Sequence, residues 1–453
     1  MLKAFAQKIQ PIWKPSINGT QSLKHRLIQG AIGSFGLKIA GSGLAFVLSV
    51  ILARVLGSEG LGTYAYAMIW ANLVSIPATL GIDQLIVREM AIYRAKSQWK
   101  LMRGLLRWST STVLVASLGL TLIAVVIAWS IQGNNQNLVL AVFLAMTIVP
   151  LASLRNLRLG AMRGLDCIVL GQIPDALFAP VIVIVLIALG YGLFPHNFGV
   201  YWVLASKITA VVLTFFIGTL WLRRSLPDAI FNIKPQYQGK QWLLAALPFM
   251  FLGTIELINS RIDIIMLGGI EGVAAVGIYT VIFGITQLTA FVHQAALGVL
   301  GPTIANLYAQ GKLSKLEQVI QKSILGVFLI SLVIGGTIIG CSKYVLLIFG
   351  AEFVSGALAM NILIGGQMFN ALTGPVGLVL NMTGHQRQTA IATGISAILN
   401  IMLNAILIPF WGINGAAIAT TISMIAINMI KVILIRQRLG ISLYSLPKLF
   451  SDN

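Results

Sequence analysis

Residues 30–52 read GAIGSFGLKIAGSGLAFVLSVIL, an apolar run with one charged residue, Lys38, inside it. A helix of about 20 such residues crosses the hydrocarbon core of a bilayer. Similar runs recur along the chain and bring the total to about twelve: 63–80, 105–130, 138–157, 167–189, 199–222, 242–267, 273–300, 319–340, 357–380, 389–409 and 413–435. The pattern predicts an all-α, polytopic membrane protein with about twelve transmembrane helices.

The composition excludes a water-soluble domain of this length. Charged residues make up 9% of the 453, apolar residues 57%, and the mean hydropathy is +0.91. A soluble domain carries about a quarter charged residues, and a single core does not grow large enough to hold this apolar excess. A net charge of +19 could indicate binding to nucleic acid, but the basic residues are scattered between apolar runs and form no patch.

The distribution of basic residues predicts the orientation of the helices. Most of the 31 Lys and Arg residues precede the first run, follow the last, or lie in the even-numbered connections. The odd-numbered connections carry only Arg54 and Lys343, while Lys38, Lys207 and Arg261 fall inside helices. Arg155, Arg158 and Arg163 flank the fourth connection. Since positive residues stay on the cytoplasmic side, both termini are expected to be cytoplasmic.

Two halves of the chain share landmarks. Gly62-Thr63-Tyr64 opens the second run, and Gly277-Ile278-Tyr279 opens the eighth. Six helices per half is an even number, so the halves would share one orientation, as in a parallel repeat. Short glycine turns recurring by chance are the alternative. The predicted division is a cytoplasmic segment 1–27, a six-helix lobe 28–224, a cytoplasmic linker 225–241, a second six-helix lobe 242–438 and a cytoplasmic tail 439–453.

Three stretches resemble a known family. They are LARVLGSEGLGTYAYAMIWANLVSIPATLGIDQLIVREMA (52–91), RIDIIMLGGIEGVAAVGIYTVIFGITQL (261–288) and GPTIANLYAQGK (301–312). In this order they resemble the polysaccharide-transport proteins, which are O-antigen-type oligosaccharide flippases of the multidrug/oligosaccharidyl-lipid/polysaccharide superfamily. The resemblance covers nearly the whole chain.

The resemblance implies a secondary transporter in a bacterial-type cytoplasmic (inner) membrane. It would flip a polyprenyl-pyrophosphate-linked oligosaccharide from the inner to the outer leaflet by alternating access, for surface polysaccharide assembly. Polysaccharide polymerase and glycosyltransferases would be its partners. The runner-up is an ion-coupled cation antiporter of the related multidrug and toxin extrusion family.

Cations inside the apolar runs are the candidates for binding the pyrophosphate. They are Lys38, Lys207 and Arg261, followed by Arg54 at the end of the first run. A charged side chain is costly in a bilayer and usually faces the bundle interior or a wet cavity. Fixed cations there can replace the hydration of an anionic headgroup. For Arg54, an interfacial side chain that reaches toward the headgroups is an equally good interpretation.

Acidic residues inside the runs are candidates for ion or proton coupling. Glu256, Asn259 and Asp263 share one helix face through their i, i+3, i+7 spacing, and Asp175 lies in the fifth run. Intramembrane carboxylates are typical of proton and cation pathways. A structural clamp between helices, with Lys38 or Lys207 as partner, remains the alternative.

Several functions lack their sequence signals. The chain contains no G-x-x-x-x-G-K-[ST] phosphate loop. Cys167, Cys341 and the four histidines have no metal-ligand spacing. The longest outer connections, near 190–198 and 342–356, are short and nearly uncharged, so no enzyme is expected. We therefore predict no cofactor, with transport driven by protons, Na⁺ or the membrane potential.

One cytoplasmic connection suggests contact with lipid headgroups. Residues 83–103 form a basic amphipathic segment in which Tyr93 and Trp99 are interleaved among cations. Anionic inner-leaflet lipids attract such segments, so these lipids are predicted partners. A loop that only sets the topology is an equally good interpretation.

Overall fold

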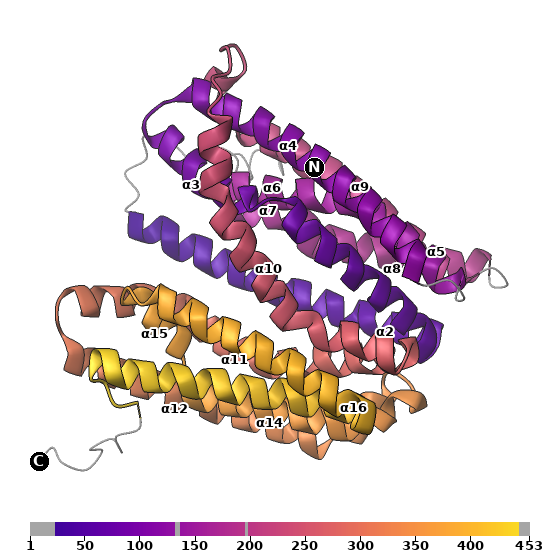
Figure 1. The fold of residues 1–453 in the computed structure, drawn as a ribbon. Helices are drawn as coiled ribbons and strands as arrows, with labels where there is room; N and C mark the ends of the chain where they lie inside the picture. Colours follow the sequence, from indigo (N-terminus) through magenta and orange to yellow (C-terminus); the bar gives the residue numbers. More distant parts are fainter. Residues whose placement is uncertain (1–22, 132–135, 195–197, 444–453) are drawn as a thin grey trace, which may run out of the picture. The chain divides into compact units, whose positions relative to one another are not determined.

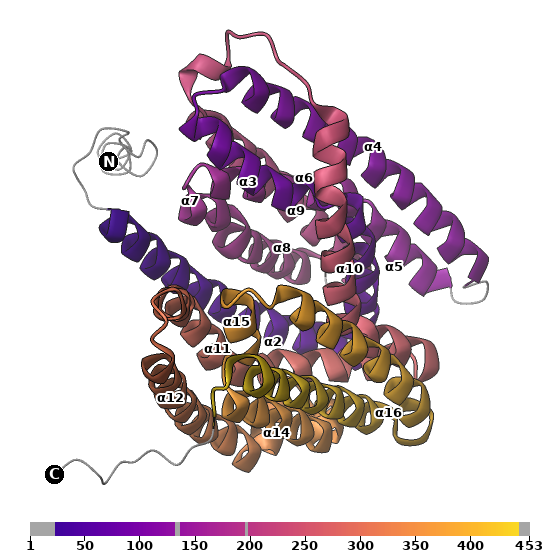
Figure 2. The ribbon, with the colours of Figure 1, turned by 60° about the vertical axis from the view of Figure 1, so that its left-hand side comes forward.

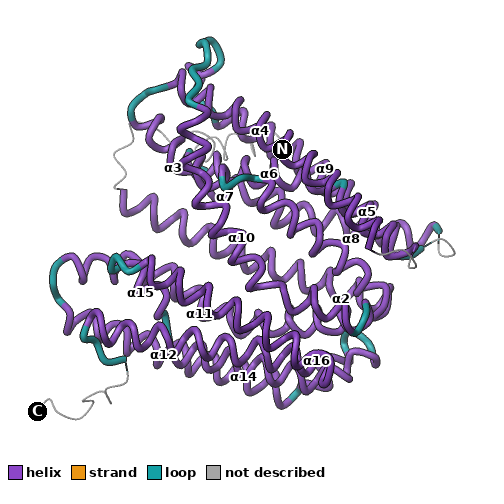
Figure 3. The backbone as a smooth tube through the Cα atoms, viewed as in Figure 1, coloured by secondary structure: helices purple, strands orange, loops and turns teal. Residues whose placement is uncertain are grey.

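The computed structural model describes residues 23–131, 136–194 and 198–443, and every regular element in these ranges is a helix (Figures 1 and 3). The predicted all-α class is therefore confirmed. Most of the predicted segment 1–27 and residues 444–453 of the predicted tail lie outside the described ranges.

The first half of the chain forms eight α-helices. They are α2 (Leu23–Ala78), α3 (Ile82–Ala95), α4 (Trp99–Ile131), α5 (Gln136–Met146), α6 (Ile148–Gly164), α7 (Ile168–Ile173), α8 (Ala179–Leu193) and α9 (Val200–Ser225). A π-helical turn, η1 (Pro174–Phe178), joins α7 to α8.

The second half is also helical. Its α-helices are α10 (Gly239–Ile270), α11 (Val273–Ala309), α12 (Leu313–Gly340), α13 (Ser342–Leu347), α14 (Ala357–Thr373), α15 (Val376–Met382) and α16 (Gln386–Leu439). Two 3₁₀ turns complete the set, η3 (Asp228–Ile230) before α10 and η4 (Ala351–Gly356) before α14.

Nine helices in the described ranges are long and apolar enough to cross a membrane, or ten if the bent pair 351–373 and 376–382 counts as one span. Two of the nine, α2 and α16, have 56 and 54 residues. At 1.5 Å per residue each is about 80 Å long, far more than the bilayer core of about 30 Å. Both contain a break at a left-handed glycine, Gly57 (φ 67°) and Gly412 (φ 51°), where a side chain would be strained. These breaks are compatible with two spans in each of the two helices. The count of twelve transmembrane helices stays a prediction.

The chain divides into two compact units. Unit 1 comprises residues 1–52 and 63–257, and unit 2 comprises 53–62 and 258–453. The boundaries between the two units thus fall inside α2 and α10. The lobe boundaries derived from the sequence, with a linker at 225–241, stay a prediction.

Unit 1 is built around α6, which packs against α3, α4 and α9 (Figures 1 and 2). Ile82, Ile86 and Met90 on α3 are fully buried, so the apolar face of the predicted amphipathic segment packs on protein. On α4, in contrast, Val115 and Leu122 are exposed seven residues apart. An exposed apolar stripe of this kind suits contact with lipid.

The segment predicted as a linker packs firmly on unit 1. The Gln236 amide donates to the Lys100 carbonyl at 3.0 Å, and the Arg103 side chain donates to the Ile233 carbonyl. At the start of α10, the Trp242 indole donates to the Tyr93 hydroxyl at 3.0 Å. Residues 233–242 therefore extend the core of unit 1.

Unit 2 is a bundle in which α14 packs against α11, α12 and α16 (Figure 2). Gly62 and Gly277, two of the landmarks of the predicted repeat, allow a close backbone approach. A Cβ on Gly62 would overlap the Val273 carbonyl, and a Cβ on Gly277 would overlap the Ser58 carbonyl. The short segment 53–62 is thereby held tightly against α11.

Candidate functional site

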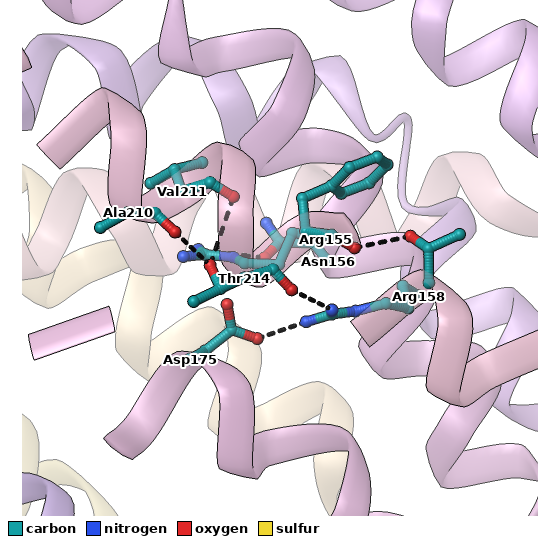
Figure 4. Close-up of polar contacts among 9 residues, drawn as sticks. Arg155, Asn156, Arg158, Asp175, Ala210, Val211 and Thr214 are labelled. Carbon is teal, nitrogen blue, oxygen red and sulfur yellow. Dashed lines mark hydrogen bonds and ion pairs between the residues drawn. The ribbon is translucent and has the colours of Figure 1, made fainter. Parts of the chain in front are cut away.

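A cluster of charged side chains lies inside unit 1, on α6, η1 and α9. Arg158 is 4% exposed and forms an ion pair with Asp175 at 2.5 Å between Nη2 and Oδ2 (Figure 4). Its Nη1 donates to the Thr214 carbonyl at 3.0 Å. The guanidinium is therefore engaged on two sides, as a buried cation requires.

Local sequence features build this pair. The Ala179 amide bonds to the Pro174 carbonyl five residues earlier, which makes the π-helical turn around Asp175. Pro180 has no amide hydrogen, so an ordinary helical bond cannot form at the next position. Gly218 of α9 makes room for the arginine, because a Cβ there would overlap the Arg158 guanidinium. Single-turn π-helices inside α-helices are frequent at functional sites.

Two further cations act on the same carboxylate. Arg155, one turn before Arg158, and Lys207 of α9 both interact electrostatically with Asp175. Both are half-buried, and the Arg155 Nε is buried without a hydrogen-bond partner in the described chain. Within the described residues neither forms an ion pair closer than 4 Å with an acid. The cluster thus sets three cations against one carboxylate, which is an arrangement suited to an anionic ligand.

Arg155 and Arg158 were predicted to flank the fourth connection. In the structure α6 continues to Gly164 and carries both within a stretch that is long and apolar enough to cross a membrane. The stretch RLGAMRG (158–164) has no helix-breaking proline, so the helix continues through it. An apolar run read from hydropathy ends at the first charged residues. It therefore does not distinguish the end of a helix from a buried arginine within the helix. The available signal was Asp175, a carboxylate in the next apolar run that needs a cationic partner.

A second polar cluster lies in unit 2 around Asp263 of α10. Asp263 is 3% exposed, and the Tyr279 hydroxyl of α11 donates to its Oδ2 at 2.8 Å. The Thr420 hydroxyl of α16 lies 3.4 Å from the same oxygen, and the Ile264 amide donates to Oδ1 at 2.8 Å. Within the described residues no cation forms an ion pair with this carboxylate. Three helices thus converge on one buried acid.

The other members of the predicted acidic stripe do not join Asp263. Glu256 is exposed and belongs to unit 1, whereas Asn259 is half-buried and belongs to unit 2. Arg261 points its guanidinium over the ring of Phe283, with 4.9 Å to the ring centroid, and is held by a cation–π contact. Sequence reasoning missed Tyr279 and Thr420, whose hydroxyl groups surround the acid.

Lys38 and Arg54 have different surroundings from Lys207. Lys38 is exposed on α2. Arg54 donates from Nε to the Ile348 carbonyl at 2.7 Å and from Nη2 to the Leu347 carbonyl at 2.6 Å. These carbonyls end α13, so Arg54 caps a helix C-terminus, where a cation is favourable. Its predicted role in anion binding stays a prediction.

The fold defines a class of protein, the multi-pass helical membrane proteins. Two solved structures share this fold. An inward-facing multidrug resistance MATE family transporter of the MOP superfamily superposes with a TM-score of 0.74, 15% identity and coverage of 90% of this chain and 98% of its own. The lipid II flippase MurJ, in an inward closed conformation, gives a TM-score of 0.68, 13% identity and coverage of 90% and 87%. At these identities the likeness concerns the fold.

The sequence comparisons specify the family. The polysaccharide biosynthesis protein model matches residues 27–308, and the chain belongs to that family. The MatE model matches residues 248–406. A probable low-salt glycan biosynthesis flippase, Agl15 of Haloferax volcanii, is 24% identical over 89% of this chain and 82% of its own length. The expected family resemblance is confirmed, and these relatives are named as flippases and transporters, in agreement with a non-enzymatic role.

Proposed function

We propose that this chain is a secondary transporter that flips a polyprenyl-pyrophosphate-linked oligosaccharide from the inner to the outer leaflet by alternating access. The family match and the flippase Agl15 among its relatives support a lipid-linked glycan as substrate. The MurJ-like fold supports the same class of activity.

The observation that carries the proposal is the excess of cations in the cluster of unit 1. The guanidinium of Arg158 is bonded to Asp175 and Thr214, whereas Arg155 and Lys207 have hydrogen-bond donors left for a ligand. A pyrophosphate that leaves water loses its hydration, and positioned guanidinium and ammonium groups replace it. We therefore assign the headgroup contact to Arg155 and Lys207. Lys38, Arg54 and Arg261 remain candidates for contact with the headgroup at other points of its path across the membrane.

Asp263 is our candidate for ion or proton coupling. It is the one member of the predicted stripe that is buried. Its side-chain hydrogen-bond partners are hydroxyl groups, and Arg261 acts on it electrostatically without forming an ion pair within 4 Å in the described residues. An intramembrane carboxylate in this setting can accept a proton or a small cation. Asp175, the other predicted coupling residue, is engaged by Arg158 and is assigned to the headgroup cluster.

A cation antiporter is the second candidate function. The MatE match over 248–406 and the MATE-like fold favour it. The chemistry of unit 1 opposes it, because a cluster with three cations and one acid repels a cationic drug.

Reconstitution into proteoliposomes tests the two candidates side by side. We expect a fluorescent polyprenyl-pyrophosphate glycan to cross the bilayer in a protein-dependent manner, and a cationic dye not to be exported. Lys207→Met should abolish most glycan movement, with Lys234→Met as the control, since Lys234 is exposed and outside the cluster. Dye export without glycan movement would overturn the proposal in favour of the antiporter.

The proposed setting is a cytoplasmic membrane of bacterial type. The described helices support a multi-pass membrane protein, with both termini and residues 83–103 on the cytoplasmic side. Exposed cations there, Arg88 and Lys96 among them, would meet anionic lipid headgroups. Enzymes that build and polymerise the glycan would act before and after the flipping step.

A further inference from the structure

Asp175 is the one acid in the described chain that acts on all three cations of the unit 1 cluster. It bonds to Arg158 (Figure 4). It also acts electrostatically on Arg155 and Lys207. Its side chain is 18% exposed, while that of Arg158 is 3% exposed. The carboxylate therefore lies on the more accessible side of the pair.

The three cations differ in what they can offer a ligand. Arg158 already gives Nη1 to Thr214 and Nη2 to Asp175. Within the described residues, Arg155 makes one hydrogen bond, a long one of 3.4 Å to the Asn156 side chain, and Lys207 makes none. Among the described acids, Asp175 is the one that acts electrostatically on both Arg155 and Lys207.

We propose that Asp175 is a built-in counter-anion for Arg155 and Lys207, which the substrate's phosphate displaces electrostatically on binding and which helps to expel it on release. This inference rests on the proposed function and deepens it by assigning a positioning residue to the headgroup site. Arg158 anchors the carboxylate, and the π-helical turn holds it on the cluster side of η1.

The consequence is a trade between affinity and turnover. A cluster without the carboxylate would carry one more unit of net positive charge and hold an anion more tightly. A transporter must also release its cargo, so tighter binding slows the cycle. Asp175 thereby lowers the net positive charge of the site, so that the headgroup is not held too strongly for release.

The test compares the initial rate of glycan-lipid flipping across substrate concentrations for three proteins. In Asp175→Asn, which still offers an acceptor oxygen to Arg158, we expect KM to fall about tenfold and kcat to fall as well. The double variant Arg158→Gln/Asp175→Asn removes both charges and restores the net charge of the cluster. Its KM should return to within a few-fold of the wild type, while kcat stays low because the displacing carboxylate is missing.

Unchanged or raised KM in a folded Asp175→Asn protein would overturn the inference. If Asp175→Asn does not fold, the double variant provides the test. Wild-type values of both KM and kcat in the double variant would show that the ion pair is only structural and would overturn the inference. Lys207→Met separates this outcome from failure of the proposed function. If the wild type flips glycan lipid and Lys207→Met does not, the function stands whatever Asp175 does, whereas a wild type that moves no glycan lipid overturns the function itself.

Discussion

Unit 1 pairs a half-buried carboxylate with a buried arginine, whereas unit 2 buries a carboxylate among hydroxyl groups. Asp175 has Arg158 at 2.5 Å, and Asp263 has Tyr279 at 2.8 Å and Thr420 at 3.4 Å. An ion pair tolerates the loss of neither partner, because the survivor is left as an uncompensated charge. A carboxylate held by hydroxyls becomes neutral when it takes up a proton, and no bonded cation is then left without its partner. The two units are thus built for different tasks, anion contact in the first and coupling in the second.

The largest expected effect comes from breaking the ion pair of unit 1. Arg158→Ala leaves Asp175 without its bonded partner and should destabilise the protein by about 3–5 kcal/mol. Thermal unfolding in detergent, followed by tryptophan fluorescence, measures the loss. Arg107→Ala is the matched control, since Arg107 is exposed at the start of α4. Equal Tm values for the two variants would contradict the assignment of a buried pair.

A smaller loss is expected when the space for Arg158 is filled. Gly218→Ala places a Cβ where the guanidinium lies, so the arginine must move, at a cost of about 1–3 kcal/mol. The same thermal assay applies. Gly326→Ala on α12 is the control, because a Cβ there meets open space and alanine favours a helix. If Gly218→Ala is as stable as Gly326→Ala, the close approach of α9 to Arg158 is wrong.

The carboxylate of unit 2 should be removable at a lower cost. Asp263→Asn keeps an acceptor for Tyr279 and Thr420 and should cost about 1–2 kcal/mol, as should Tyr279→Phe. Glycan flipping by Asp263→Asn should nevertheless cease to depend on an imposed proton or Na⁺ gradient. Gradient-dependent flipping at the wild-type rate would leave Asp263 a structural clamp and remove its coupling role.

The two cysteines extend the comparison through labelling rates. Burial raises the pKa of the Cys167 thiol in unit 1, whereas Cys341 in unit 2 is exposed. At pH 7.5, maleimide should modify Cys341 at least about ten times faster, because the thiolate is the reactive form. The Cys167 rate should keep rising as the pH increases toward its raised pKa. Cys341→Ser identifies the slow component.

The same cysteines test the predicted topology. An impermeant maleimide added to intact cells should reach Cys341, in the ninth connection. It should reach Cys167, at the predicted cytoplasmic edge of the fifth run, only after the membrane is opened. Reversal of this pattern would contradict the cytoplasmic placement of the termini.

Part of the site was readable from the sequence. Lys207, Asp175 and Asp263 stand out because a charge in an apolar run is rare and needs a reason. Arg155 and Arg158 did not stand out, because they lie at the end of an apolar run and just after it, where they resemble the topogenic charges of a loop. Tyr279 and Thr420 are ordinary residues in a membrane helix until a carboxylate from another helix lies beside them.

The sequence by itself determined the solvent, the helical class and the family. These follow from hydropathy and from motifs that are local in the chain, and the bilayer leaves a helix as the way to satisfy the backbone of such apolar runs. The tertiary structure decided which charges meet: that Arg158 pairs with Asp175, that Arg54 caps α13, and that Asp263 has hydroxyl partners. Such pairings join residues from different helices, and their distances depend on helix packing, which the spacing along one helix does not specify.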